Sequence, residues 1–209
     1  MAVVDRPASL ALVGRRGDEA WVGGMATAPA YRRQGLGAQA LVAAIEAVGC
    51  PTVWLEVLQG NRPAIALYHK LGFERVRELI VWTLNSPGTA AWRPAKPDRA
   101  HAWIAGHRTV REPWQRADAS LTQIEALVVE RDGEVAGAAL YRDRGDARII
   151  IQAAALDAAA ARETLLATRG GLRFANVAPD DLFAPALEEL GGRREASQFE
   201  LALTRQRAS

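Results

Sequence analysis

The sequence predicts an α/β (α+β) protein with a mixed sheet, and a second half that repeats the first. Three observations predict this fold class. Apolar runs typical of strands alternate with segments in which apolar residues recur every three or four positions, as on one face of a helix. Clusters of glycine and proline separate these segments. The order of segments in the second half matches the order in the first.

Each element of the first half ends at a recognisable boundary. Gly14–Asp18 supplies a turn between the first two strands, and Gly49 and Pro51 end the first helix. Asn61 caps the second helix, which Gly72 ends. The predicted elements are strands at 9–13 and 20–27, a helix at 35–48, a strand at 52–58, a helix at 61–72 and a strand at 74–84.

Residues 85–99 are predicted to be a linker because they contain three prolines and a glycine. This linker divides the chain into a first domain at 1–84 and a second domain at 100–209. The second domain is predicted to contain a partly helical segment at 100–115, a hairpin of strands at 124–129 and 134–141, a strand at 148–152, a helix at 157–168, a strand at 172–177, a helix at 181–190 and a strand at 197–203.

The two halves also align residue by residue. A shift of 119 residues (190 − 71) places Leu71 on Leu190, Leu55 on Phe174 and Asn61 on Asp180. This alignment indicates a diverged internal duplication, and a chance alignment of two α/β segments is the alternative.

Composition excludes several classes of function. The chain is 49% hydrophobic and 24% charged, as in soluble globular proteins, and a net charge of +2 is too small to indicate a nucleic-acid partner. The three histidines and the single Cys50 form no cluster with metal-ligand spacing, so no metal is expected. No apolar run could span a bilayer and no signal peptide precedes the domain, so we expect a cytoplasmic protein without a membrane partner.

The stretch before the first helix has the chemistry of an anion-binding loop. A helix start presents unpaired N–H groups and the positive end of the helix dipole, glycines let an oxyanion approach the backbone, and arginines add charge. These features predict a pyrophosphate cradle. A glycine-bearing loop that only caps a surface helix is the alternative, and the Rossmann and Walker fingerprints are both absent. The loop residues are Arg32, Arg33, Gln34, Gly35, Leu36 and Gly37.

This loop and two later motifs together resemble the GCN5-related N-acetyltransferase (GNAT) superfamily. The later motifs are Trp54-Leu55-Glu56-Val57 and the stretch from Asn61 to Phe73. The second is specific, because it combines an asparagine, a tyrosine seven positions later, and Leu-Gly-Phe. The likeness covers residues 9–84 and is strongest to the branch that acetylates protein N-termini, such as ribosomal-protein alanine acetyltransferases. It implies a GNAT-like α+β fold, in which helices flank a mixed, mostly antiparallel sheet, with a degenerate second copy.

The resemblance implies acetyl-CoA as co-substrate, bound where the strands at 20–27 and 52–58 separate. It further implies that backbone groups of Met25 and Thr27 pair with the pantetheine arm, as an added strand would. Asn61 would bind the arm near its thiol end. The pyrophosphate would lie on the cradle residues: Arg32, Arg33, Gln34, Gly35, Leu36 and Gly37.

Two residues are implied to take part in the chemistry. Tyr68 would be the general acid that protonates the leaving thiolate. The alternative is that Tyr68 only packs a helix against the sheet through its aromatic ring. Glu56 matches the base of the N-terminal acetyltransferase branch, and its alternative role is to order the acceptor pocket. Many family members place a carboxylate on the preceding strand instead, but here Gly23 and Gly24 occupy the matching positions.

Two departures from the family pattern affect the prediction. Under the 119-residue shift, Glu56 falls on Ala175 and Tyr68 on Leu187, so the second half is expected not to bind the cofactor. The family's opening strand and helices have no counterpart ahead of Trp21. Residues 100–123 or a partner subunit, for example in a homodimer, are candidates to replace them.

The sequence therefore predicts an N-acetyltransferase that moves an acetyl group from acetyl-CoA to a primary amine, on a peptide N-terminus or a small molecule. A non-catalytic acyl-CoA-binding or regulatory module is the alternative. A structural scaffold that binds no nucleotide is a third hypothesis, which the intact cradle disfavours.

Overall fold

The computed structural model describes residues 8–145 and 147–205, and the chain forms two compact units. The first unit comprises Met1–Arg77 and Gln198–Ser209, and the second comprises Glu78–Ser197. Strands β4 (Glu74–Pro87) and β10 (Arg193–Thr204) each begin in one unit and end in the other. The last strand of the chain therefore belongs in part to the first unit.

The first unit consists of a sheet and two α-helices. Its strands lie in the order β1-β2-β3-β10. The pair β2–β3 is parallel, whereas β1–β2 and β3–β10 are antiparallel. The elements predicted for this half are confirmed, with small shifts at their ends. They are β1 (Ser9–Arg16), β2 (Glu19–Thr27), α1 (Leu36–Val48), β3 (Thr52–Leu58) and α2 (Arg62–Lys70), with the short 3-10 helix η1 (Pro29–Tyr31) ahead of α1.

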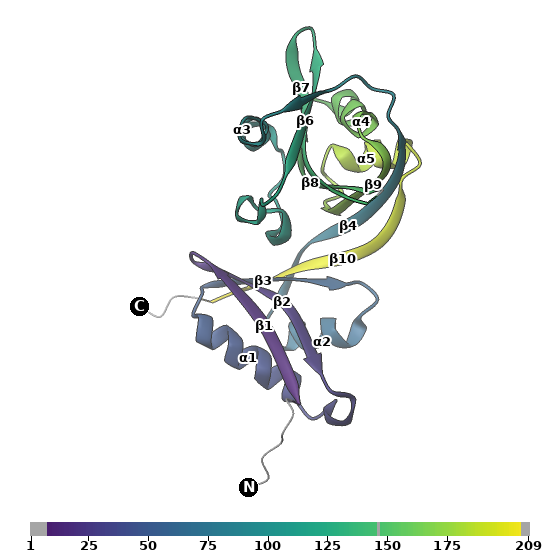
Figure 1. Ribbon diagram of the computed structural model, residues 1–209. Coiled ribbons are helices and arrows are strands. Elements are labelled where there is room, and N and C mark those ends of the chain that lie inside the picture. The colour runs from purple at the N-terminus through teal and green to yellow at the C-terminus, as the bar shows by residue number, and fades with distance from the viewer. Residues whose placement is uncertain (1–7, 146, 206–209) are drawn as a thin grey trace. The chain divides into compact units, whose positions relative to one another are not determined.

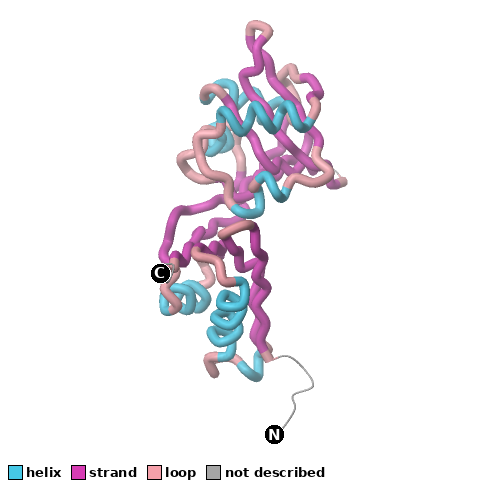
Figure 2. Tube along the Cα trace, turned by 90° about the vertical axis from the view of Figure 1, so that its left-hand side faces the viewer, coloured by secondary structure: helices cyan, strands magenta, loops and turns pink. Residues whose placement is uncertain are grey.

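Both helices of the first unit lie on one face of its sheet (Figures 1 and 2). Side chains alternate along β3, so that Val53, Leu55 and Val57 face the helices while Trp54 and Glu56 face the other side. The core between sheet and helices contains Ala20, Val22, Leu41, Ile45, Cys50, Val53, Leu55, Val57, Tyr68, Phe73 and Leu201.

The parallel strands β2 and β3 separate along their length, as the resemblance implies. Among the described residues their last registered pair is Trp21 with Trp54. Both strands continue beyond this pair, to Thr27 and Leu58. A gap between two strand edges, with backbone groups not used by the sheet, therefore opens next to the helices.

A β-bulge lies at the start of this gap. The pairing of β2 with β1 shifts by one residue at Gly23, which is an extra residue on β2. Before the bulge Val22 faces the helices, and after it Met25 does so, since the bulge reverses the alternation of side chains. The bulge therefore turns Met25 toward α2.

The second unit has its strands in the order β4-β9-β8-β7-β6-β5. The pair β8–β9 is parallel, and the other pairs in this order are antiparallel. In addition to β4 its elements are β5 (Arg93–Ala95), α3 (Pro97–His107), the 3-10 helices η2 (Trp114–Arg116) and η3 (Asp118–Ser120), β6 (Glu125–Arg131), β7 (Glu134–Arg144), β8 (Ala147–Ala155), α4 (Ala158–Ala167), β9 (Arg169–Val177) and α5 (Phe183–Glu189).

Helices cover both faces of the sheet in the second unit (Figure 1). Successive residues of β6 face opposite sides, since Leu127 packs in the core with α4 and α5 while Val128 packs with α3. Ile104 is the fully buried contact that α3 makes with this second core. The segment at 100–123 therefore covers a face of the second unit's own sheet.

The second unit repeats the order of elements of the first, which confirms the predicted duplication. The series β1-β2-α1-β3-α2-β4 corresponds to β7-β8-α4-β9-α5-β10. In each series an antiparallel hairpin is followed by a helix and then by a strand parallel to the hairpin's second strand. Leu55 of β3 and Phe174 of β9, which the 119-residue shift aligns, are both buried in matching strands.

The compact units divide the chain differently from the predicted domains at 1–84 and 100–209. The predicted linker at 85–99 contains the end of β4, paired with β9, and the strand β5, paired with β6. Pro87 is the last residue of β4, Pro94 lies in the edge strand β5 and Pro97 is at the first turn of α3, all places where a missing N–H group is tolerated. The composition of this stretch thus reflects turns within the second unit and does not mark a domain boundary.

Candidate functional site

A cavity of about 850 Å³ opens in the first unit on the helix side of the sheet. It extends along the end of β2, the loop into α1 and the first two turns of α2. All predicted site residues line it except Gln34 and Glu56. The lining consists of Met25, Ala26, Thr27, Tyr31, Arg32, Arg33, Gly35, Leu36, Gly37, Ala38, Asn61, Pro63, Ala64, Leu67 and Tyr68.

Gly35 forms the N-cap of α1 and leaves the helix start open. Its φ of 79° is in the left-handed region, where glycine is strongly preferred. The first helical N–H bonded back to this cap is that of Gln39, at 3.1 Å from Gly35 O. Because a glycine cap carries no side-chain acceptor, the first-turn N–H groups are available to a ligand in the cavity.

Gly37 has a different role, which is close packing. A Cβ atom added to Gly37 would lie 3.1 Å from Thr27 Oγ1 and 3.8 Å from Met25 Cε. The first turn of α1 therefore contacts the end of β2 directly. This contact places the open helix N-terminus beside the strand edge at the gap.

The polar residues of the loop differ in whether they line the cavity. Arg32 lines the cavity and its Nε donates a hydrogen bond to Thr27 O at 3.2 Å. Arg33 also lines the cavity and has a left-handed backbone, with φ of 62°. Gln34 instead donates from Nε2 to Ala30 O at 3.1 Å and does not line the cavity. The loop thus brings two guanidinium groups, but not the predicted glutamine, to the open helix start.

Asn61 caps α2 and also lines the cavity. Its Oδ1 accepts a hydrogen bond from Ala64 N at 3.3 Å, so the capping role predicted from the sequence is confirmed. With Oδ1 engaged, the Nδ2 group is the side-chain donor that could reach a bound molecule.

Tyr68 lies at the inner end of the cavity. Its side chain is 8% exposed, packs edge-on against Phe73 with ring centroids 5.8 Å apart, and contacts Met25 Sδ through its hydroxyl at 3.6 Å. Burial raises the pKa of the Tyr68 phenol above its usual value, so the hydroxyl is protonated at neutral pH. The packing and the cavity position occur together, so the two predicted roles of Tyr68 do not exclude each other.

Glu56 lies across the sheet from Tyr68. It points away from the helices, and its Oε2 accepts a hydrogen bond from Trp21 Nε1 at 2.6 Å. Trp21 is on β2, so this bond crosses from β2 to β3 where their pairing ends. The gap between these strands therefore has a phenol on its helix side and a carboxylate on its opposite side.

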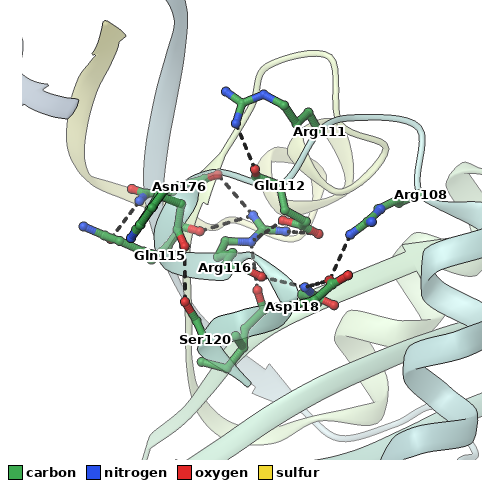
Figure 3. Close-up of polar contacts among 12 residues, drawn as sticks. Arg108, Arg111, Glu112, Gln115, Arg116, Asp118, Ser120 and Asn176 are labelled. Atoms are coloured by element: carbon green, nitrogen blue, oxygen red, sulfur yellow. Dashed lines mark hydrogen bonds and ion pairs between the residues drawn. The ribbon is translucent and has the colours of Figure 1, made fainter. Parts of the chain in front are cut away.

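The equivalent gap in the second unit is filled by the chain itself (Figure 3). The parallel pair β8–β9 ends at Ile150 with Phe174. The side chain of Arg116, 3% exposed, bonds to carbonyls on both strands beyond that pair. Its Nε donates to Ile151 O at 2.8 Å, and its Nη1 donates to Ala175 O at 3.2 Å and to Asn176 O at 3.1 Å.

Neighbouring groups hold this arginine in place (Figure 3). Glu112 forms a buried ion pair with Arg116, with Oε2 at 2.9 Å from Nε. Gln152 of β8 donates from Nε2 to Arg116 O at 2.6 Å. Burial raises the pKa of Glu112, while the guanidinium of Arg116 opposes this rise. We refer to residues 112–118 as the plug, because they occupy the place of a ligand between the strands.

The helix start next to the second gap is also closed. Asp157 caps α4, and its Oδ1 accepts from Ala160 N at 2.7 Å. Arg131 donates to the same carboxylate at 2.9 Å, and these bonds hold the pKa of Asp157 below its usual value. An acidic cap both uses the first-turn N–H groups and repels an anion. This geometry agrees with the prediction that the second half lacks a cofactor site.

Two residues of these arrangements were not identified from the sequence. Trp21 and Arg116 each bond to residues 35 or more positions away, so no local pattern marks them.

In the part of the chain that the structure describes, no group of three or more His, Cys, Asp or Glu side chains could hold a metal ion. Within the same residues, no helix is long and apolar enough to cross a membrane.

Comparison with known sequences relates the first unit to one family. Residues 4–73 match the model of the Acetyltransferase (GNAT) family. The ribosomal protein bS18-alanine N-acetyltransferase of Escherichia coli (strain K12) is 48% identical over 59 residues, which are 27% of this chain and 40% of that protein. The protein of the same name from Salmonella typhimurium (strain LT2) is 42% identical over 72 residues, 33% of this chain and 49% of that protein. The chain thus spans less than half the length of these curated relatives.

Solved structures extend the similarity in fold to both units. A GCN5-related N-acetyltransferase from Sphaerobacter thermophilus matches with a TM-score of 0.69 at 15% identity, covering 94% of this chain and 76% of its own. A tandem GNAT protein from the clavulanic acid biosynthesis pathway matches with a TM-score of 0.61 at 15% identity, covering 97% of this chain and 85% of its own. At this identity the likeness shows the fold alone, which is a tandem one.

Proposed function

We propose that this protein transfers an acetyl group from acetyl-CoA to a primary amine, and that the first unit carries the active site, because residues 4–73 match the model of the Acetyltransferase (GNAT) family. The second unit is, in this proposal, a degenerate copy that binds no coenzyme. The amine is on a peptide N-terminus or a small molecule.

One observation carries this proposal: a single cavity is lined both by the open start of α1 and by Tyr68. At one end, N–H groups at residues 35–38 and the charges of Arg32 and Arg33 suit a diphosphate. At the other end, a buried phenol suits a thioester sulfur. The edge of β2 around Met25 lies between them and could pair with the amides of a pantetheine arm, as an added strand would.

The chemistry proposed for these groups is direct transfer. The amine nitrogen attacks the thioester carbonyl carbon, a C–N bond forms and the C–S bond breaks. The leaving sulfur takes the proton of the Tyr68 hydroxyl, which solvent restores, and the amine loses its proton to Glu56, directly or through water. Since Glu56 lies on the face away from the cavity, the amine would enter the strand gap from that face.

Two measurements on the whole chain test the proposal. Titration calorimetry with acetyl-CoA separates a coenzyme-binding protein from a scaffold. Release of free thiol from acetyl-CoA across a panel of amines then separates an enzyme from a binder. The panel contains alanine-initiated peptides, chosen because the matched relatives are named as alanine N-acetyltransferases, together with aminoglycosides and polyamines.

The variant Tyr68→Phe tests the acid. Turnover should fall by about 10²-fold, within the range of general acid–base catalysis, while acetyl-CoA affinity stays within about twofold, because the ring and its packing remain. Tyr141→Phe is the matched control, since Tyr141 is also buried but lies in the second unit. An unaltered rate for Tyr68→Phe would remove the acid role. Binding without thiol release for any amine would favour the non-catalytic module.

A further inference from the structure

Trp21 and Glu56 form a short hydrogen bond between separate strands at the point where the strands diverge. The distance from Trp21 Nε1 to Glu56 Oε2 is 2.6 Å. An indole N–H is a donor only, so the carboxylate oxygen is the acceptor in this bond. A donor of this kind favours the ionised carboxylate, and the bond to a charged acceptor is stronger than one to a neutral group.

The backbone on both sides of Trp21 is adapted to its ring. Trp21 belongs to the last registered pair of β2 with β3, so its backbone is fixed by the sheet. The ring then extends over Gly23, where an added Cβ would lie 2.7 Å from Trp21 Cζ3. That distance is too short for any side chain. The bulged glycine therefore provides the space in which the indole lies to reach β3.

We propose that Trp21 is a positioning residue that holds the carboxylate of Glu56 at the strand gap in one orientation. The inference rests on the proposed function, since it concerns the base of that reaction. Trp21 need not contact the amine. It acts by fixing the terminal torsion of the Glu56 side chain, so that the carboxylate keeps one position relative to the gap.

The consequence for pH dependence has a definite sign. Besides the indole, the charged group beside Glu56 is Glu200 of β10, which is in register with it and forms an ion pair with Arg77 that the substitution at Trp21 leaves in place. A hydrogen bond donated to an ionised carboxylate lowers its pKa, so removing the donor is expected to raise the pKa of Glu56. A base acts only when deprotonated. The acid limb of the kcat/KM profile should therefore move to higher pH when the indole N–H is lost.

Trp21→Phe is the test, because it keeps an aromatic ring over Gly23 and removes the N–H donor. We expect kcat/KM for the amine to fall about tenfold at pH 7, and the acid limb to rise by about one pH unit. Acetyl-CoA affinity should be unchanged, since Trp21 does not line the cavity. A purely structural tryptophan would lower the unfolding temperature and leave the limb in place.

Trp54→Phe is the matched control. Trp54 is the registered partner of Trp21 on β3, and its Nε1 also donates to a glutamate, but to Glu19 Oε1 at 2.9 Å. This variant should lose a comparable hydrogen bond and leave the acid limb of the profile where the unsubstituted protein has it.

The outcomes separate this inference from the proposed function. If the unsubstituted protein turns over and Trp21→Phe leaves the limb unmoved, or Trp54→Phe moves it equally, the inference is overturned. If no amine is acetylated, the proposed function fails, and a ¹³C NMR titration of the glutamate carboxyls, with Glu56→Gln for assignment, still decides the inference. A rise in the Glu56 titration midpoint in Trp21→Phe supports it, and an unchanged midpoint overturns it.

Discussion

In both units a parallel pair of strands stops pairing partway along, after Trp21 and Trp54 in the first and after Ile150 and Phe174 in the second. In the first unit a cavity of about 850 Å³ lies along the end of β2, beyond the last pair with β3. In the second, the plug fills the gap, with Arg116 bonded to the carbonyls of both strands. The same fold thus provides a ligand slot in one copy and a closed core in the other.

The helix starts beside the two gaps also differ: the one in the first unit is open and the one in the second unit is capped. Gly35 caps α1 without a side chain, whereas Asp157 caps α4 with a carboxylate that accepts from Ala160 N. One start therefore attracts an anion and the other repels it. Two independent changes, at the helix cap and at the gap, close the second copy. The shared fold therefore leaves the gap open in one copy and filled in the other, and the groups at the helix cap and in the gap make that difference.

The largest expected effect is on the closed gap. Arg116→Ala should lower the free energy of unfolding by about 3–5 kcal/mol, because it leaves the buried Glu112 carboxylate without its ion-pair partner and removes the hydrogen bonds of Arg116 to three carbonyls. Urea denaturation followed by tryptophan fluorescence measures this change. Acetyl-CoA affinity of the folded protein should not change.

Arg131→Ala is the control for that variant. Arg131 is half-exposed and pairs with Asp157 and Glu163 at the surface of the second unit, so its loss should destabilise the protein much less than the loss of Arg116. Equal losses for the two arginines would show that the plug does not stabilise the second unit. A second molecule of acetyl-CoA bound by Arg116→Ala would show that the plug alone closes that gap.

The next largest effect concerns the open helix start. Gly35→Glu should weaken acetyl-CoA binding at least about a hundredfold, because bringing like charges together costs several kcal/mol and a side chain at φ of 79° is strained. Calorimetry measures the loss. Gly133→Glu is the matched control, since Gly133 has φ of 83° and open space around it but lies in the β6–β7 turn. Equal binding by the two variants would contradict the anion site.

The smallest expected effect concerns the packing of α1 on β2. Gly37→Ala should weaken acetyl-CoA binding by about tenfold or less, the range expected from mild overpacking, since the new Cβ would lie 3.1 Å from Thr27 Oγ1. Thr27→Ala removes that atom and keeps the backbone, so the double variant should recover most of the affinity. If the double variant binds no better than Gly37→Ala, the close approach is not what places the helix start.

The parts of the fold that follow local rules were predictable from the sequence. Periodicity and turn residues predict the helices and strands of both halves. Glycines and arginines at a helix start predict that the loop from Arg32 to Gly37 borders a binding cavity. The prediction of a linker at 85–99 is wrong. Proline is common in linkers, but it also occurs at strand ends and helix starts, as it does here. Local composition does not distinguish these cases.

The interactions that make the two units differ could not be predicted from local sequence patterns. The bonds of Arg116 to Ile151 and Ala175, and of Trp21 to Glu56, join residues far apart in the chain. The alternation in β10 predicts a half-buried strand, but it does not reveal that β10 pairs with β3 of the first unit. Such pairings depend on the assembled sheet, and a single sequence carries no local sign of them.

A crystal structure of the whole chain with acetyl-CoA tests the central claim most directly. We predict electron density for one coenzyme, in the first unit, with its diphosphate on the N–H groups at 35–38 and its sulfur within hydrogen-bonding distance of the Tyr68 hydroxyl. The gap of the second unit should still contain Arg116. A diphosphate bound elsewhere, a Tyr68 hydroxyl directed away from sulfur, or a coenzyme between β8 and β9 would contradict the account.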